Sequence, residues 1–353
     1  MCILNKLSFW NGKKVLITGH KSFKGAWLCK ILEIAGAEVI GYGLQAPTFP
    51  SLFDICKPGV HNVNGDIRDF DKLLVTFEKT CPEIVIHMAA QPLVLDSYRI
   101  PKFTYEVNVM GTVNVLECVR INTGVKSLLN VTTDKVYLNK ERTEGYSEDE
   151  ELNGYDPYSN SKSCSELITS SYNNSFLKNM EIAVSTARSG NVIGGGDFSA
   201  NRLIPDCAVA LAKGEVIKIR NPNAVRPYLH VLDTLFVYLK ILQKQYEDIS
   251  FAGAYNIGPN ETDCATNGQL VDYFCKAWGD SANWKHIPTD NPHESTLLKL
   301  DCSKIKKVLN WTPHWDIEKS VWETVSWYKA YFTGEMANDV MVSQIEEFFI
   351  GAE

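Results

Sequence analysis

A tyrosine and a lysine stand four residues apart in the segment YDPYSNSKSCSEL, as Tyr158 and Lys162. On a helix this spacing places both side chains on one face. A nearby ammonium stabilises tyrosinate and lowers the phenol pKa, so that the tyrosine can take the proton of a substrate alcohol while hydride leaves to a nicotinamide. The pair therefore predicts alcohol oxidation, with Tyr158 and Lys162 as catalytic residues that also contact the cofactor.

The same spacing occurs a second time, at Tyr98 and Lys102. With fifteen tyrosines in the chain, about one such pair is expected by accident. Pro101 lies inside this second pair and disfavours an unbroken helical turn, whereas residues 158–170 contain no proline. We therefore expect the first pair, and not the second, to be catalytic.

A hydroxyl, an acid and a base follow one another as Thr133, Asp134 and Lys135, after the apolar run SLLNV. Ligands of an open α/β sheet bind at the carboxyl ends of the strands, where these three residues would lie. Two interpretations remain open from the residues alone. The three are either a catalytic set or a strand-to-loop turn with solvated charges.

The segment TGHKSFKG, residues 18–25, lies between an apolar run and a helical pattern. Backbone N–H groups of a glycine-rich turn, with the partial positive charge of a helix N-terminus, can hold a pyrophosphate. Gly25 is in place, but Ser22 stands where a glycine is usual, so the fingerprint is incomplete. A plain turn, with Gly25 needed only for close packing, is the alternative. The candidate cofactor-binding residues here are Gly19, Lys21, Ser22, Phe23, Lys24 and Gly25.

The adenosine end of such a cofactor has no clear acidic partner. Leu44-Gln45-Ala46 stands at the end of the second apolar run, where an acidic residue usually binds the ribose. This position therefore does not decide between NAD and NADP. Asp66 and Ile67, in GDIRD, are candidates near the adenine, and a turn or helix cap is the alternative for Asp66.

Short apolar segments alternate with helical ones over the first half of the chain. Strands are predicted at 13–19, 37–44, 83–90, 126–133 and 181–194, and helices at 25–35, 108–120 and 158–170. Because the strands are apolar nearly throughout, we predict an α/β fold with a Rossmann-type doubly wound parallel sheet. The alternation weakens after about residue 195, which predicts a smaller, mostly C-terminal α/β substrate domain. The predicted dinucleotide-binding domain comprises 1–194 and 229–257, and the substrate domain comprises 195–228 and 258–353.

Composition and charge exclude several classes of protein. The length of 353 residues suits about two domains, and a net charge of -7 disfavours nucleic acid as a partner. Ten cysteines without a CxxC pair indicate reduced thiols and predict no metal site. Without an apolar run of eighteen residues or a leader-like start, we expect no membrane partner and a cytoplasmic protein.

Ten segments together resemble the extended short-chain dehydrogenase/reductases, and within them the nucleotide-sugar 4,6-dehydratases. The likeness runs from Phe9 to about Gly334. Related dTDP- and GDP-sugar dehydratases carry Thr-Asp-Glu where this chain has Thr133-Asp134-Lys135, and the lysine is typical of the CDP-glucose branch. The segments are TGHKSFKGAWL, GDIRDF, HMAAQPLV, NVMGTVNVLE, TTDKVY, YDPYSNSK, RSGNVIGGGD, NRLIPD, IRNPNAVRPYLHV and LKLDCSK.

The resemblance implies that NAD is the cofactor and a nucleotide sugar, CDP-glucose, the substrate. Tyr158 would take the C4 hydroxyl proton as hydride leaves C4, and Thr133 would hydrogen-bond the C4 oxygen. Neutral Lys135 would then remove the C5 proton while protonated Asp134 donates to the departing C6 hydroxyl. Hydride returned to C6 would give a 4-keto-6-deoxy sugar with no net redox change. Both roles require environments that raise the pKa of the acid and lower that of the base.

The resemblance also implies binding residues and an assembly. The stretch Ala89, Ala90 and Gln91, together with Asn108, would line the dinucleotide. The nucleotide sugar would contact Asn191, Arg202, Arg220, Arg226 and His293, with Arg226 as the preferred diphosphate ligand. For each arginine an ordinary surface charge is the alternative, and for His293 a plain loop. A homodimer or higher homo-oligomer is expected from the family.

Two other functions remain as alternatives. Another nucleotide-sugar enzyme of the same fold could act on dTDP- or GDP-sugars, or epimerise at C4, although epimerases usually lack the acid and base pair of Asp134 and Lys135. A non-catalytic dinucleotide-sensing protein would keep the glycine turn but would not need Tyr158 or Lys162.

Overall fold

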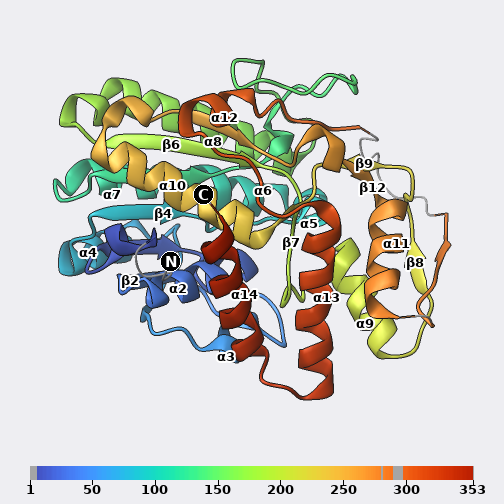
Figure 1. Ribbon diagram of the computed structural model, residues 1–353. Coiled ribbons are helices and arrows are strands. Elements are labelled where there is room, and N and C mark those ends of the chain that lie inside the picture. The colour runs from blue at the N-terminus through green and yellow to red at the C-terminus, as the bar shows by residue number, and fades with distance from the viewer. Residues whose placement is uncertain (1–5, 280, 289–296, 353) are drawn as a thin grey trace.

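One parallel β-sheet forms the centre of the computed structural model, which describes residues 6–279, 281–288 and 297–352 (Figure 1). Its strands are β1 (Lys14–Thr18), β2 (Glu38–Gly43), β3 (His61–Asn64), β4 (Ile84–His87), β5 (Ser127–Val131), β6 (Ala183–Ser189) and β11 (Ala254–Ile257). They lie in the order β11-β6-β5-β4-β1-β2-β3, and every neighbouring pair is parallel. The strand order reverses between β1 and β4, which is where open α/β sheets bind ligands. The predicted doubly wound sheet is confirmed.

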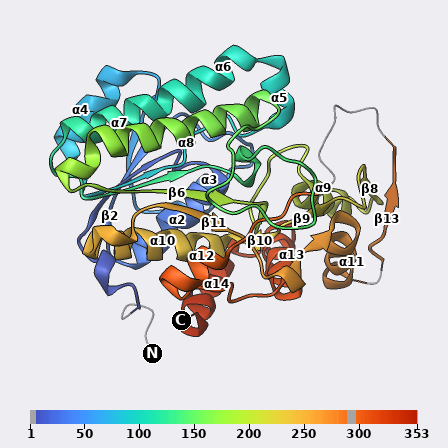
Figure 2. The same ribbon diagram turned by 90° about the horizontal axis from the view of Figure 1, so that it is seen from above.

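Helices cover both faces of the sheet (Figure 2). One layer comprises α4 (Phe70–Thr80), α5 (Val94–Arg99), α6 (Pro101–Tyr105), α7 (Gly111–Ile121) and α8 (Pro157–Ser175). The other comprises α2 (Phe23–Ile34), α10 (Val231–Glu247), α12 (Ser303–Leu309) and α14 (Ala337–Gly351). Along β1 the side chains alternate between the two, since Leu16 packs in the α7 core whereas Val15 and Ile17 pack in the α2 core. The sheet therefore has a hydrophobic core on each face.

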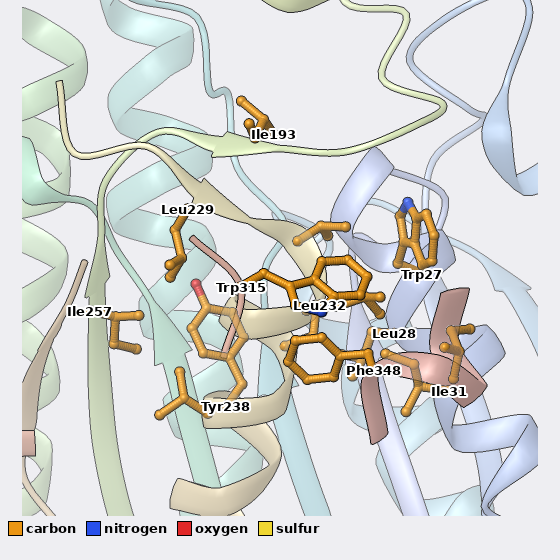
Figure 3. Close-up of a cluster of buried hydrophobic side chains, with 14 of the residues drawn as sticks. Trp27, Leu28, Ile31, Ile193, Leu229, Leu232, Tyr238, Ile257, Trp315 and Phe348 are labelled. Atoms are coloured by element: carbon orange, nitrogen blue, oxygen red, sulfur yellow. The ribbon is translucent and has the colours of Figure 1, made fainter. Parts of the chain in front are cut away.

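The core on the α2 side joins the two ends of the chain (Figure 3). Trp27 of α2 and Tyr238 of α10 are fully buried there. Phe348 of α14 packs edge-on against Trp315, with ring centroids 5.1 Å apart. The C-terminal helix is thus part of the same core as the first helix.

Shorter strand pairs and three helices gather beyond one end of the sheet (Figure 2). The pairs are β7 (Val192–Ile193) with β10 (Leu229–His230), β8 (Ile217–Ile219) with β13 (Trp284–His286), and β9 (Val225–Arg226) with β12 (Ala265–Thr266). The helices are α9 (Leu203–Ala212), α11 (Asn267–Trp278) and α13 (Ile317–Thr333). The remaining short segments are η1 (Ser8–Trp10), α3 (Leu52–Cys56), η2 (Glu106–Met110), η3 (Asp134–Val136), η4 (Leu177–Met180), η5 (Ile249–Phe251) and η6 (Glu261–Asp263). The domain boundaries given above stay a prediction.

Two predicted segments are interrupted, and a third stretch breaks where a break was expected. Helix 108–120 begins as the π-helical turn η2 and continues as α7, and strand 181–194 divides into β6 and β7. Tyr98 lies in α5 and Lys102 in α6, because Pro101 starts a new helix after Ile100. The second tyrosine-lysine pair therefore does not share a continuous helix, as predicted. None of the described helices is long and apolar enough to cross a bilayer.

A buried carboxylate fastens α10 to the loop before α13. Asp233 is fully buried, and its two oxygens accept the backbone N–H groups of His314, at 2.6 Å, and Trp315, at 3.3 Å. Burial raises the pKa of Asp233 to about 7, although both hydrogen bonds lower it.

Asp233→Asn should remove the part of the pH dependence of the free energy of unfolding that comes from this carboxyl group. Because the folded pKa lies above the unfolded value, the stabilising contribution of the proton is complete below about pH 4 and is lost as pH rises to about 7. The free energy of unfolding of the wild type, relative to the variant, should fall by up to about 4 kcal/mol over that range. Urea unfolding at a series of pH values measures this difference. A difference that does not change with pH would contradict the assignment.

Candidate active site

The end of β5 turns into a single turn of 3-10 helix, η3, that displays the acid and the base. Thr133 is in an extended conformation and caps η3, since its Oγ1 accepts the Lys135 N–H at 3.4 Å. The same hydroxyl donates to Asp134 Oδ1 at 2.9 Å. The Lys135 ammonium lies 3.5 Å from that oxygen, so the three side chains form one connected group.

Helix α8 brings Tyr158 and Lys162 to this group. Asp156 caps the helix by accepting the Ser159 N–H at 3.0 Å, and Pro157 is its first residue. The Thr133 hydroxyl lies close enough to the Tyr158 phenol to lower its pKa. The two candidate sets predicted from separate segments therefore meet at one site.

Burial is the main cause of the pKa shifts of Tyr158 and Lys162. Loss of water around its hydroxyl raises the pKa of Tyr158 to about 12, although the nearby Thr133 hydroxyl and the charge of Arg202 lower it. Burial lowers the pKa of Lys162 to about 8, and Glu166 opposes that shift. The Lys162 ammonium donates to the Val131 carbonyl at 3.1 Å. The predicted depression of the Tyr158 pKa is thus wrong for the chain without ligand, because desolvation outweighs the neighbouring positive charges.

Asp134 and Lys135 differ in their access to solvent. The Asp134 side chain is 1% exposed and that of Lys135 is 27% exposed. Asp134 Oδ2 is buried and has no hydrogen-bond partner among the described residues. A buried oxygen without a partner is placed to meet a polar group of a ligand.

The glycine turn has the conformation that a pyrophosphate site needs. Gly19 has a φ of +76°, and a Cβ there would lie 2.8 Å from the Ala89 nitrogen. A Cβ at Gly25 would lie 2.5 Å from the Gly19 oxygen. Ser22 caps α2 by accepting the Gly25 N–H at 3.3 Å. The serine therefore replaces the usual glycine with a helix cap, and the residues fit a dinucleotide.

The other residues of the turn differ in their surroundings. Lys21 is half-buried, as is Phe23, the first residue of α2. The Lys24 ammonium lies 5.7 Å from the centre of the Tyr238 ring. Burial, with the charges of Lys162 and Arg202, lowers the pKa of Lys24 to about 7.

Asp66 is held by a neighbouring arginine. Its carboxylate pairs with the Arg68 guanidinium at 2.7 Å and accepts the Arg68 backbone N–H at 2.9 Å. These bonds hold the pKa of Asp66 below its usual range. Ile67 is buried against Gly111, where an added Cβ would lie 2.4 Å from its Cδ1. The proposed adenine contact of Asp66 stays a prediction.

Asn108 fixes the segment after β4. Its Oδ1 accepts the Gln91 N–H at 2.8 Å, and its Nδ2 donates to the Gln91 carbonyl at 3.0 Å and to Ser161 Oγ at 2.9 Å. Both amide protons are therefore used within the protein. In this structure Asn108 shapes the wall formed by Ala89, Ala90 and Gln91.

The predicted substrate residues lie on segments beyond the sheet. Asn191 follows β6, and its carbonyl accepts the Leu229 N–H at 2.9 Å. Arg202 pairs with Asp197 at 3.1 Å and acts electrostatically on Tyr158. Arg220 donates to the Asn201 carbonyl at 3.4 Å, while buried Arg226 donates to the Val225 carbonyl at 3.0 Å. Of these, Arg202 lies beside the catalytic group, and His293 lies outside the described residues.

A buried ion pair behind the catalytic residues was missed by the sequence analysis. Glu166 accepts from Arg188 at 2.9 Å, and the side chains are 3% and 5% exposed. Glu166 also accepts from the hydroxyls of Thr132 and Thr186. Its position four residues after Lys162 was a visible signal, whereas nothing in the sequence pointed to Arg188.

Without ligand, Tyr158 should stay protonated well above neutral pH. The ultraviolet difference between wild type and Tyr158→Phe should show no tyrosinate from this residue at pH 9, because its pKa is about 12. Tyr155→Phe removes an exposed phenol three residues away and is the matched control. A tyrosinate signal at pH 8 that only Tyr158→Phe abolishes would contradict the expectation.

Fold and site together define a short-chain dehydrogenase/reductase with an added acid and base. A sequence profile of the family described as GDP-mannose 4,6 dehydratase matches residues 16–324. The CDP-glucose 4,6-dehydratase of Salmonella typhimurium is 46% identical over 336 residues, which cover 93% of this chain and 94% of that protein. The dTDP-D-glucose 4,6-dehydratase of Mus musculus is 30% identical over 335 residues, which cover 91% of this chain and 90% of that protein.

The fold is shared with solved structures. The UDP-glucose 4-epimerase of Thermus thermophilus, solved as a complex with NAD, has a TM-score of 0.78 and 25% identity, and the match covers 89% of this chain and 98% of the epimerase. With the profile match and the Salmonella relative, the chain belongs to the nucleotide-sugar 4,6-dehydratase family.

Proposed function

We propose that this chain is an NAD-dependent lyase that converts CDP-glucose to CDP-4-keto-6-deoxyglucose. The observation on which the proposal rests is that α8 brings Tyr158 next to the Thr133-Asp134-Lys135 group, close enough for Thr133 and Asp134 to shift its pKa. An oxidising pair alone fits any dehydrogenase, whereas the adjoining acid and base add an elimination. The Salmonella relative and Lys135, in place of the glutamate of dTDP- and GDP-sugar dehydratases, support CDP-glucose as the substrate.

The cofactor would lie across the switch point between β1 and β4. The turn from Gly19 to Gly25 and the N-terminus of α2 would hold its pyrophosphate, with Ala89 to Gln91 along its side. When bound, NAD would take up hydride from C4, return it at C6 and add a positive charge to the site. The NAD complex of the related epimerase supports this choice of cofactor.

The first step is oxidation at C4. Tyr158 accepts the proton of the C4 hydroxyl, and Thr133 hydrogen-bonds the same oxygen. Because burial holds the Tyr158 pKa near 12 in the free chain, the phenolate must be favoured in the complex by positive charge, and Lys162 supplies part of it. The product of this step is a 4-keto sugar whose C5 proton is acidified.

The second step removes water across C5 and C6. Neutral Lys135 takes the C5 proton, and protonated Asp134 gives its proton to the C6 hydroxyl, which leaves as water. When hydride is returned to C6, Lys135 gives a proton back to C5. The proton that Tyr158 took from the C4 hydroxyl passes to solvent, and Asp134 regains one from solvent, so the sum is the loss of one water molecule with no net oxidation.

The nucleotide part of the substrate would be bound by the arginines beyond the sheet. Buried Arg226 remains the preferred diphosphate ligand, and Arg202, whose charge acts on Tyr158, would contact the phosphate nearest the sugar. Asn191, Arg220 and His293 complete the proposed binding set. This set belongs to the proposed substrate domain, 195–228 with 258–353, apart from Asn191, which lies just before it.

Assembly and location are part of the same proposal. We expect a homodimer or larger homo-oligomer, as the family suggests. We expect the enzyme in the cytoplasm, which agrees with the free thiols of the nine described cysteines.

Incubation with a panel of nucleotide sugars tests the function. CDP-glucose should yield the 4-keto-6-deoxy product without accumulation of NADH, and in deuterated water the solvent label should enter at C5. Product mass and NMR measure both outcomes. Absence of product from every sugar of the panel would refute the dehydratase assignment, and product without label at C5 would refute the role of Lys135.

A further inference from the structure

A chain of buried side-chain hydrogen bonds connects the glycine turn to helix α8. At its centre is His87, the last residue of β4, which is 2% exposed. Its Nδ1 lies 2.7 Å from Thr18 Oγ1, at the start of the turn, and its Nε2 lies 3.1 Å from Thr112 Oγ1 on α7. The imidazole therefore bridges the turn and the helical layer that contains α8.

The partners of Thr18 agree with one direction for the first bond. Thr18 Oγ1 accepts the Ala89 N–H at 3.2 Å and shares the Met88 N–H, at 3.1 Å, with the Thr18 carbonyl, at 3.2 Å. With these N–H groups on the oxygen, the hydroxyl proton is the one that points to His87, so that Nδ1 is an acceptor and the ring proton sits on Nε2.

The bonds beyond Nε2 agree with that assignment. Thr112 Oγ1 donates to the Asn108 carbonyl at 2.7 Å, so it accepts from His87 Nε2 and from Ser165 Oγ, 3.1 Å away on α8. Ser165 in turn accepts from Asn130 Nδ2 at 3.0 Å. The Nε2–H tautomer of His87 satisfies each of these bonds, from the turn to the helix that holds Tyr158 and Lys162.

The surroundings keep the ring neutral. Burial lowers the pKa of His87 to about 3, and the charge of Lys162 on α8 lowers it further. The groups that touch the ring from β1 and α7 are the uncharged hydroxyls of Thr18 and Thr112.

We propose that His87 is a positioning residue of the active site. As the neutral Nε2–H tautomer it fixes the distance between the Gly19 turn and α8, and so places the bound dinucleotide relative to Tyr158 and Lys162. Its effect on turnover rests on the proposed function, but its tautomer and its effect on dinucleotide binding do not.

The tautomer can be observed directly in the purified protein. Long-range ¹H–¹⁵N spectra of histidine-labelled protein, with the His87 signal assigned by its loss in His87→Asn, should show the Nε2–H form. The pattern should not change between pH 5 and 9. A Nδ1–H pattern, or titration of this signal in that range, would overturn the proposal.

Two substitutions test the two hydrogen bonds of the His87 ring separately. The amide of His87→Asn retains an acceptor near Thr18 and loses the donor to Thr112, whereas His87→Gln retains the donor and loses the acceptor. The Gln variant should weaken NAD binding in calorimetry by about tenfold, because the turn loses its support. The Asn variant should bind NAD within about twofold of wild type but turn over about tenfold more slowly, because α8 is displaced relative to the cofactor.

Thr112→Val replaces the histidine variants in this test if either of them fails to fold. Like His87→Asn, it should keep NAD affinity near that of the wild type and slow turnover about tenfold. Thr324→Val is the matched control, because Thr324 is equally buried and donates only within its own helix, to the Ser320 carbonyl at 2.7 Å. Variants that lose thermal stability but match Thr324→Val in NAD affinity and turnover would overturn the positioning role. If no nucleotide sugar is dehydrated, the tautomer and the NAD affinities still test the positioning role of His87.

Discussion

The packing of α8 against the end of β5 is the interaction on which the rest of the site depends. Three hydrogen bonds hold the two segments in register. The Lys162 ammonium donates to the Val131 carbonyl, the Ser163 hydroxyl to the Val136 carbonyl, and the Thr132 hydroxyl to Glu166. Under the proposed function, this packing fixes an oxidising pair and an acid-base pair around one substrate position, as proximity catalysis requires.

This arrangement needs buried charge, which is stabilised by specific partners. Glu166 and Arg188 form a buried pair, and Arg188 also donates to the Tyr137 hydroxyl at 2.9 Å and the Glu148 carbonyl at 2.8 Å. A buried pair gains little net stability over apolar packing, but it has few alternative geometries. We infer that it keeps α8, β5 and β6 in one arrangement. Preorganised polar groups of this kind contribute strongly to catalysis.

The sequence was sufficient for the fold and for the candidate catalytic residues, because both depend on local patterns. The five predicted strands are apolar nearly throughout and end at turns, and Tyr158 and Lys162 are one helical turn apart. Strand β3, with the polar sequence HNVN, has no such pattern and was not among the predicted strands. Contacts between elements could not be predicted in this way. The partner of Arg188 depends on sheet register and helix placement, and the Tyr158 pKa depends on how much water the folded site excludes. The same limit applies to His87, whose role rests on neighbours from β1 and α7.

The central claim is that oxidation and dehydration are two halves of one internal redox cycle at this site. CDP-glucose deuterated at C4 tests it most directly, since the label follows the hydride. NMR and mass spectra of the product should show the deuterium at C6 of the same sugar. Deuterium that stays at C4, or that is lost from the product, would contradict the account.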